Sequence, residues 1–372
     1  MASRQRPVPC RRDTVPYGDD DAILAAFRRD GYVVVRDVLT ASEVEAAVDE
    51  LWTSRQLLGR SDTVVRDEAS TWASCVSWPQ QNGGKNFLES VDPFQDRTCW
   101  EFVQHPHVVH LQRLLYGGAV LCTEVGRWGV MRPTKDHPEW RTEDNWLHWD
   151  QNPWREPEFT RVQCFACLTE QTPASGGFLC VPGFHNRFRA WGEEHPEGTV
   201  FVSGRQMTSQ NGAMAPFLVP DDDPIRAQTV RVSAPPGALV LWDGRLPHQN
   251  YPNSGSEFRI VHYLNFVPAA EEAVVERRAA LERKLAVLRA LGRLREGACF
   301  PDGLTRFGRE VTAAPGPAED QLEPGLQAAL QLLHQAGEEE LKGNLDESTE
   351  LMRKAGKVWP DIESWYDAVW GS

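Results

Sequence analysis

The feature that most constrains this chain is a series of short apolar segments between residues 119 and 265, separated by turns rich in proline and glycine. Short alternating segments with turns of this kind are typical of antiparallel strands. One example runs from Thr229 to Trp242 and reads as strand, Pro-Gly turn and strand. Residues 119–265 therefore predict an antiparallel double-sheet barrel.

His148 and Asp150 lie two residues apart in a segment that can be extended, Trp146-Leu-His-Trp-Asp150. In an extended chain, residues i and i+2 point to the same side, so one metal ion can bind both side chains. Two imidazoles and one carboxylate are the ligand set that holds non-haem Fe(II) and leaves coordination positions open. The pair therefore predicts two of the three ligands of an iron site.

The same His-x-Asp/Glu pattern occurs twice more, as His137-Pro-Glu139 and His195-Pro-Glu197. About 1.4 matches are expected by chance in a chain with 10 His and 53 acidic residues, so the pattern alone is weak. Both further matches carry a proline, which is disfavoured in a central strand. We interpret these residues as parts of loops.

A second histidine and an arginine follow about a hundred residues later. His248 comes directly after the tight connection Asp243–Pro247, and Arg259 lies in the β-rich segment Phe258–Phe266. Taken alone, such a histidine is usually a packing residue and such an arginine an ion-pair partner. The joint pattern favours His248 as the third iron ligand, and the rigid fork of Arg259 suits the far carboxylate of 2-oxoglutarate.

Four stretches of the chain occur in the order of one known family. They are Asp30–Leu39, Trp146–Asp150, Gly176–His185 and Pro236–His248, the last followed by Arg259. Together they resemble the phytanoyl-CoA dioxygenase (PhyH) family of Fe(II)/2-oxoglutarate-dependent oxygenases, over about residues 20 to 270. The resemblance implies a mainly β fold with flanking helices and a double-stranded β-helix (jelly-roll, cupin-like) core. It also implies Fe(II), 2-oxoglutarate and O₂ as cofactor and co-substrates.

The resemblance assigns roles to individual residues as well. The metal ligands that it implies are His148, Asp150 and His248. The contacts to 2-oxoglutarate that it implies are Arg259, Trp242, Asn250 and Arg132. Asn250 stands where relatives often have a serine, and its amide can both donate and accept.

Two tryptophans near the ligands, Trp149 and Trp154, are predicted to contact the substrate. Trp154 matches an aromatic residue at the pocket mouth of some members, and core packing accounts for it equally well. His185 is interpreted as structural. Members that halogenate lack the carboxylate ligand, so Asp150 indicates hydroxylation or a related oxidation.

Charge narrows the class of substrate. The net charge of −14 disfavours nucleic acid as a partner, because a polyanion would meet a repulsive field.

No apolar run approaches ~18 residues, so no membrane span is expected. The start of the chain lacks the apolar core of a signal peptide, which favours a cytoplasmic location. A small organic molecule is the expected substrate, and the oligomeric state stays open.

The eight cysteines form no disulfide or zinc framework. Cys164 and Cys167 have CxxC spacing, but they lie in a strand-like segment. Residues three apart on a strand face opposite sides and cannot bind one zinc ion. Reduced, buried thiols are expected.

The length of 372 residues suits one large catalytic domain plus an appendage. We predict a flexible tail at 1–18, a dioxygenase domain at 19–270, and a helical C-terminal extension at 271–372 packed on the core. The last fifty residues have the pattern of a helical hairpin that turns at Gly343-Asn344.

Within the dioxygenase domain, helices are expected at Asp19–Arg29 and Ser42–Ser54. Residues 60–100 and 186–227 are interpreted as long loops that could fold over the pocket, and an irregular surface insertion accounts for residues 60–100 equally well.

These patterns favour an Fe(II)/2-oxoglutarate-dependent dioxygenase that hydroxylates a small molecule. The first alternative is a catalytically silent barrel that only binds a ligand. The second is an oxygenase that modifies a macromolecule, which the charge disfavours without excluding it.

Overall fold

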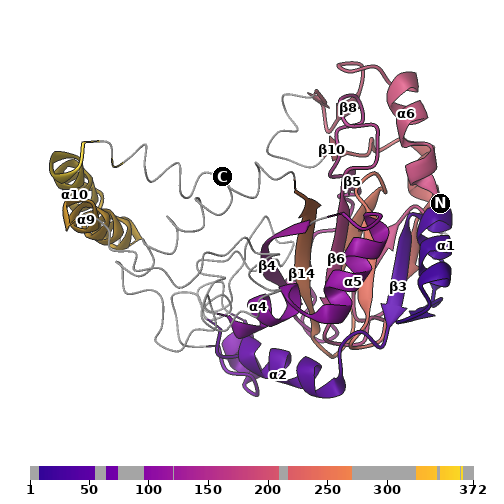
Figure 1. Ribbon diagram of the computed structural model, residues 1–372. Coiled ribbons are helices and arrows are strands. Elements are labelled where there is room, and N and C mark those ends of the chain that lie inside the picture. The colour runs from indigo at the N-terminus through magenta and orange to yellow at the C-terminus, as the bar shows by residue number, and fades with distance from the viewer. Residues whose placement is uncertain are drawn as a thin grey trace. The chain divides into compact units, whose positions relative to one another are not determined.

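The computed structural model describes residues 8–54, 64–73, 96–119, 121–208, 217–269, 324–341, 344–360 and 362 (Figure 1). The chain divides into two compact units, Met1–Pro268 and Ala269–Ser372. Every strand that the structure describes lies in the first unit.

Two six-stranded sheets form the first unit. Sheet A contains, in spatial order, β1 (Cys10–Arg11), β11 (Val230–Val232), β7 (Gly177–Cys180), β13 (His248–Tyr251), β5 (His148–Trp149) and β10 (Phe217–Leu218). Sheet B contains β2 (Val15–Pro16), β3 (Tyr32–Arg36), β12 (Leu239–Asp243), β6 (Val162–Cys167), β14 (Arg259–Pro268) and β4 (Leu121–Met131). All pairings within the sheets are antiparallel except β1–β11 and β2–β3.

The inner faces of the two sheets pack against each other through aromatic side chains. Phe178 of sheet A lies 4.8 Å from Trp242 and 6.2 Å from Phe165 of sheet B, measured between ring centroids. Alternate residues of each strand point inward, which is why these positions share one core cluster. This confirms the predicted double-stranded β-helix, or jelly roll.

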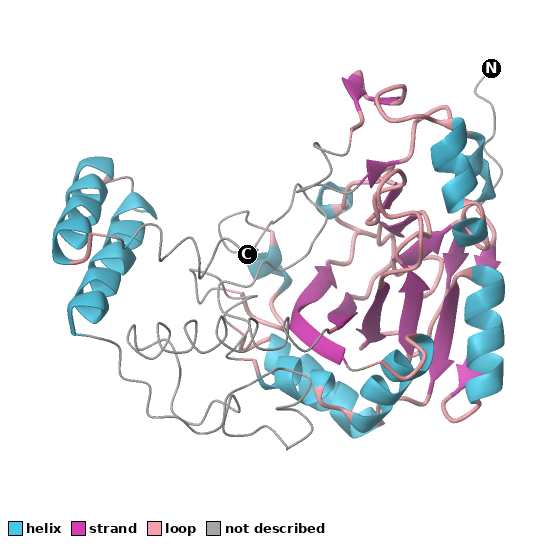
Figure 2. Ribbon diagram, turned by 45° about the horizontal axis from the view of Figure 1, so that its top comes forward, coloured by secondary structure: helices cyan, strands magenta, loops and turns pink. Residues whose placement is uncertain are grey.

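Helices cover the outer face of sheet B (Figures 1 and 2). They are α1 (Asp20–Asp30), α2 (Ala41–Leu51), α4 (Arg97–Val103) and α5 (Pro106–Leu115). The first two confirm the expected helices to within a few residues. A capping box between Thr40 and Glu43 begins α2, and Gly31, with φ of 76°, ends α1 in the left-handed conformation.

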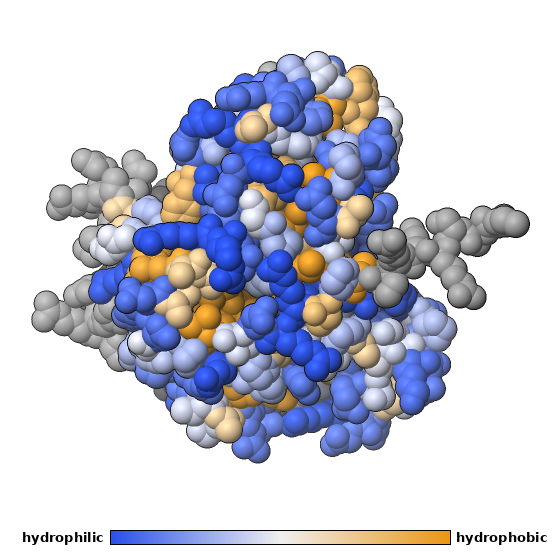
Figure 3. Space-filling view, turned by 90° about the vertical axis from the view of Figure 1, so that its right-hand side faces the viewer, coloured by the Kyte–Doolittle hydropathy of each residue, from blue (hydrophilic) through white to orange (hydrophobic). Residues whose placement is uncertain are grey.

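The face that carries α1 and α6 (Phe188–Glu194) is mainly hydrophilic, with apolar side chains in small separate patches (Figure 3). Helix α1 buries Ile23 and Phe27 against the barrel, and α6 buries Phe188 and Trp191. Each helix therefore has one apolar side that packs inward and a polar side toward solvent.

The interpretation of residues 186–227 as a plain loop is wrong for the part that the structure describes. This segment contains α6, the hairpin of β8 (Phe201–Val202) and β9 (Arg205–Gln206), strand β10 and the 3₁₀ helix η5 (Pro224–Gln228). Strand β10 pairs with β5, so the segment extends sheet A. Residues 209–216 lie outside the described residues.

Of the predicted loop at 60–100, residues 64–73 and 96–100 are described. The first part contains the 3₁₀ helix η1 (Ala69–Trp72). The loop prediction is wrong for residues 97–100, which form the first part of α4, and Trp100 among them is 3% exposed. Two further short helices are η3 (Pro138–Trp140) and η4 (Phe184–Asn186).

Cys164 and Cys167 lie on β6 and face opposite sides of sheet B, as predicted. Cys164 accepts a hydrogen bond from Gln112 of α5, and Cys167 accepts one from Gln171. Burial raises the pKa of each thiol to about 12, so both are inert at neutral pH.

His262 is a buried imidazole on the outward face of β14. It is 0% exposed, and its ring packs edge-on against Phe102 and Trp128. The Sγ atom of Cys99 lies 3.1 Å from its Nε2 atom. Burial lowers the pKa of His262 to about 3, so the ring is neutral in the folded protein.

We expect His262 to make the first unit less stable in acid. In the unfolded chain its pKa is about 6.5, so below that pH the unfolded state binds a proton that the folded state does not. The associated stability is present above pH 6.5 and is lost as the pH falls toward 3. Urea unfolding measures the free energy of unfolding at pH 7 and at pH 5. The decrease between the two pH values should be about 2 kcal/mol smaller for His262→Phe than for the wild type. Equal losses would contradict this.

The described part of the second unit is a helical hairpin of α9 (Pro324–Leu341) and α10 (Leu345–Val358), as predicted. Leu326 and Leu330 of α9 share a small core with Ala355 of α10. The apolar stripe predicted at Leu281, Leu285 and Leu288 lies outside the described residues. In the described parts of both units, no helix is long and apolar enough to cross a membrane.

Candidate metal and co-substrate site

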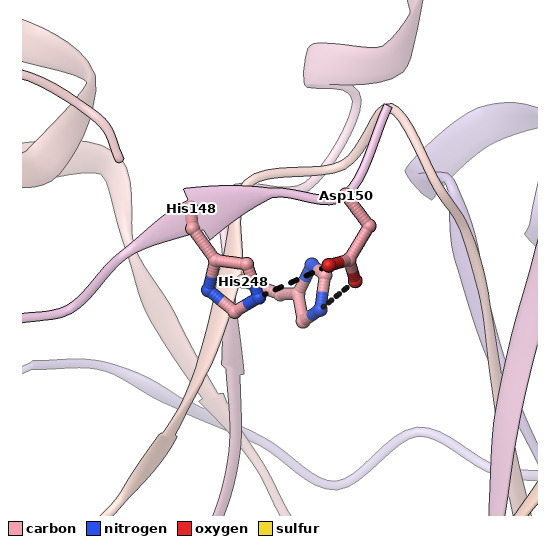
Figure 4. Close-up of side chains that lie close together, drawn as sticks. All are labelled: His148, Asp150 and His248. Carbon is pink, nitrogen blue, oxygen red and sulfur yellow. Dashed lines mark ion pairs between the residues drawn. The ribbon is translucent and has the colours of Figure 1, made fainter. Parts of the chain in front are cut away.

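Strand pairing brings His148, Asp150 and His248 together. His248 begins β13 directly opposite His148 of β5, and Asp150 follows His148 on the same face. The two oxygens of Asp150 lie 3.7 Å and 3.4 Å from the Nε2 atoms of His148 and His248. All three side chains converge on one point (Figure 4), and their ligand atoms lie within 4.8 Å of one another.

Hydrogen bonds orient both imidazoles. The Nδ1 atom of His148 lies 3.1 Å from the carbonyl oxygen of Trp146, and that of His248 lies 2.9 Å from the carbonyl of Leu246. A carbonyl can only accept, so each neutral ring carries its proton on Nδ1. The lone pair of each Nε2 then faces Asp150.

The cluster suits a divalent cation. Burial alone would raise the pKa of Asp150, but positive charge on the imidazoles of His148 and His248 and the hydrogen bond from the Gln163 amide hold it well below its usual range, so the carboxylate is ionised beside a cation. When both imidazoles are neutral, two nitrogen lone pairs converge on that carboxylate, and a metal cation between them then supplies the positive charge. Ligands at ~2.1 Å from one ion and at right angles are ~3 Å apart, somewhat closer together than the 3.4 Å and 3.7 Å separations found here. Two imidazoles and one carboxylate fit Fe(II).

Arg259 is a buried cation at the start of β14 and is 1% exposed. Its Nη2 atom donates to the Oδ1 atom of Asn250 at 3.1 Å and to the Oε1 atom of Gln171 at 3.5 Å. Among the described residues, its Nε atom has no hydrogen-bond partner and no carboxylate forms an ion pair with it. A buried charge without a counter-ion is costly, so this position suits an anionic ligand.

Asn250 lies between the metal-ligand residue His248 and the buried cation Arg259. It lies two residues after His248 on β13, so both side chains point inward about 7 Å apart along the strand. Its amide accepts from Arg259 and donates to the hydroxyl of Tyr263 at 2.9 Å. Asn250 therefore joins Arg259 by one hydrogen bond to the strand that carries His248.

Aromatic rings pack beside His248 and Arg259. Trp242 lies 5.2 Å and Phe178 5.9 Å from the ring of His248. The guanidinium of Arg259 lies 5.3 Å from the centre of the Phe165 ring. Such walls exclude water and strengthen electrostatic contacts between a ligand and the site.

The prediction that Trp149 contacts the substrate is wrong. Its side chain is 0% exposed and packs between Phe184, Phe188 and Trp191. Alternation along β5 points Trp149 to the outer face of sheet A, away from the two ligands that flank it. Trp149 is a packing residue.

Trp154 and Arg132 are held by contacts outside the triad. Trp154 is half-buried and donates from Nε1 to the carbonyl of His195 at 2.8 Å. Arg132 donates to the carbonyl of Trp72 at 2.6 Å and lies over the ring of Trp140. Their predicted roles toward substrate and co-substrate stay predictions.

His185 has the contacts of a structural residue. It is 6% exposed, and its Nε2 atom lies 3.1 Å from the carbonyl oxygen of Arg28.

Several inward residues were missed at the sequence level: Phe165, Phe178, Gln163, Gln171 and Tyr263. Gln163 could have been found, because it is a polar residue in an otherwise apolar inward row with Phe165 and Cys167. The others depend on which strands become neighbours.

Comparison with known families places this site in context. The model of the phytanoyl-CoA dioxygenase (PhyH) family matches residues 27–261, which is more than half of the chain. The match includes all three residues of the triad and Arg259.

Individual relatives are distant. The chain is 22% identical over 276 residues to a Dictyostelium discoideum protein named as a phytanoyl-CoA dioxygenase, covering 66% of this chain and 74% of the relative. It is 23% identical over 243 residues to the ectoine dioxygenase of Sphingopyxis alaskensis, covering 62% and 69%. A solved structure that is similar is SnoN, a non-haem α-ketoglutarate-dependent epimerase from nogalamycin biosynthesis. It has a TM-score of 0.46 and 20% identity over 67% of this chain and 83% of SnoN.

Proposed function

Because the chain belongs to the phytanoyl-CoA dioxygenase family of Fe(II)/2-oxoglutarate-dependent oxygenases, we propose that it hydroxylates a small organic molecule and releases succinate and CO₂. The observation that carries this proposal is that one barrel holds both a cluster of metal-ligand side chains and a buried arginine without a counter-ion among the described residues. The triad requires a cation, and Arg259, which Asn250 connects to it, requires an anion.

In this proposal His148, Asp150 and His248 hold Fe(II). When bound, iron and 2-oxoglutarate would supply the chemistry: one oxygen atom of O₂ enters succinate as 2-oxoglutarate loses CO₂, and the other oxygen atom of O₂ is inserted into a C–H bond of the substrate. The carbonyls of Trp146 and Leu246 keep both Nε2 atoms directed at the metal.

Arg259 and Asn250 bind the carboxylate of 2-oxoglutarate that is far from the metal. Arg259 offers the charge and the Nε donor that no described residue uses. Trp242 and Phe178 form the wall beside His248 and keep water out while the substrate is bound. Arg132 and Trp154 are proposed as outer contacts to co-substrate and substrate.

Two observations support a small, non-polyanionic substrate. The net charge of −14 disfavours nucleic acid. One relative is an ectoine dioxygenase, a name that specifies a small organic substrate for that protein. The cytoplasmic location also belongs to the proposal.

The proposal is tested on the full chain by adding Fe(II), 2-oxoglutarate and O₂ and measuring succinate, first alone and then with a library of small metabolites. We expect succinate without substrate at a low rate, stimulation by the true substrate, and a product heavier by one oxygen atom. Absence of both metal-dependent 2-oxoglutarate binding and succinate would indicate the silent barrel.

Two further readouts separate the alternatives. Binding of an oligonucleotide that weakens with salt, together with its oxidation, would favour a macromolecular substrate. A chlorinated product in chloride buffer would contradict Asp150 as a ligand.

A further inference from the structure

We propose that Gln163 positions the carboxylate of Asp150 for metal binding, an inference that rests on the proposed function. Gln163 lies on β6 in sheet B and reaches across the barrel to sheet A. Its Nε2 atom donates to the Oδ2 atom of Asp150 at 2.6 Å. Gln163 would thus act as a positioning residue, because it holds a metal ligand and does not itself bind the metal.

The rest of the Gln163 amide is not held by the protein that the structure describes. Its Oε1 atom is buried, and none of the described residues donates to it. Among the described residues, Asp150 is the one hydrogen-bond partner of the Gln163 amide, and a half-satisfied buried amide is unfavourable for stability. A merely structural role would favour an apolar residue, as at Phe165 and Cys167 in the same inward row.

Asp150 needs such a partner because its backbone does not orient the carboxylate. Asp150 follows the end of β5, and its side chain is 24% exposed, whereas both histidines are held through Nδ1. The Gln163 donor fixes the rotation of the carboxylate, so that its oxygens stay directed at the Nε2 atoms of His148 and His248.

The position offers a matched control. Gln112 of α5 is also a buried glutamine that donates to one partner, the Sγ atom of Cys164, at 3.0 Å. Cys164 is next to Gln163 on β6 but faces the outer side of sheet B. Loss of the Gln112 amide therefore tests the loss of a buried glutamine without touching Asp150.

The experiment measures the binding of Mn(II) alone, a redox-silent probe, to the full chain and to the variants Gln163→Met and Gln112→Met. We expect Gln163→Met to weaken Mn(II) binding about 10- to 100-fold while the metal-free protein melts at the wild-type temperature or above it. Gln112→Met should leave Mn(II) affinity within about twofold of the wild type. With Mn(II) saturating, the affinity of Gln163→Met for 2-oxoglutarate should change little, because Arg259 is untouched.

Unchanged Mn(II) affinity in Gln163→Met would overturn the inference, and so would equal losses in both variants. Failure of the wild type to bind Mn(II) would instead overturn the proposed function, so the two failures are distinguishable.

Gln163→Leu serves as a second variant if Gln163→Met does not fold. It removes the donor to Asp150 and keeps an apolar side chain in the inward row of β6. It should weaken Mn(II) binding by a factor similar to that of Gln163→Met. Wild-type affinity in Gln163→Leu would contradict the inference.

Discussion

His248→Ala is expected to abolish Fe(II)-dependent 2-oxoglutarate turnover while the protein stays folded. Only His148 and Asp150 would remain to hold a labile ferrous ion. Removing a residue that hydrogen-bonds to a metal ligand costs about 10- to 100-fold in activity, and the loss of activity on removing a ligand itself should be larger. The barrel should survive, because His248 is not part of the apolar core cluster between the two sheets. Iron content, succinate release and the melting temperature are to be measured on the same preparation.

His137→Ala is the matched control for His248→Ala. His137 is an exposed histidine that pairs with Glu139 at 3.0 Å, one of the two further His-x-Glu matches in the chain. It should retain wild-type iron content and activity. Wild-type succinate release from His248→Ala would refute the assignment of the triad.

Arg259→Ala is expected to raise the concentration of 2-oxoglutarate needed for half-maximal turnover far more than it changes iron content. Losing a buried charged contact to a carboxylate costs ~2–5 kcal/mol, or about 30-fold to several thousand-fold in affinity. The metal-free protein should not lose stability to the same extent, because in the absence of an anion Arg259 is a buried cation with only neutral partners.

Arg231→Ala controls for the loss of a guanidinium that packs on a ring. Arg231 lies 4.8 Å from the ring centre of Tyr251 and donates to the carbonyl of Pro173, away from the triad. It should leave the 2-oxoglutarate requirement unchanged. If Arg259→Ala instead loses iron and keeps its affinity for 2-oxoglutarate, Arg259 is structural.

Much of the site was predictable because it depends on local rules. The i, i+2 spacing of His148 and Asp150 places both on one face of a strand whatever the rest of the fold does. The same alternation points Trp149 to the opposite face of β5, away from the ligands that flank it. Residues 186–227 were misread because β8, β9 and β10 are two residues long each, too short for a periodic signal.

The sequence by itself determined the longer strands of the barrel and their turns, helices α1 and α2, and the residue types of an iron and 2-oxoglutarate site. It did not determine β10, nor β1 and β2, which lie in the segment 1–18 predicted as a flexible tail and are held by pairing with β11 and β3. Only the tertiary structure decided which strands are neighbours. The pairing of β13 with β5 sets His248 opposite His148, and the packing of sheet A on sheet B brings Arg259 to Asn250 and Gln163 to Asp150. Such contacts join residues far apart in the chain, and their partners are chosen by the burial of the whole inner surface rather than by any local preference.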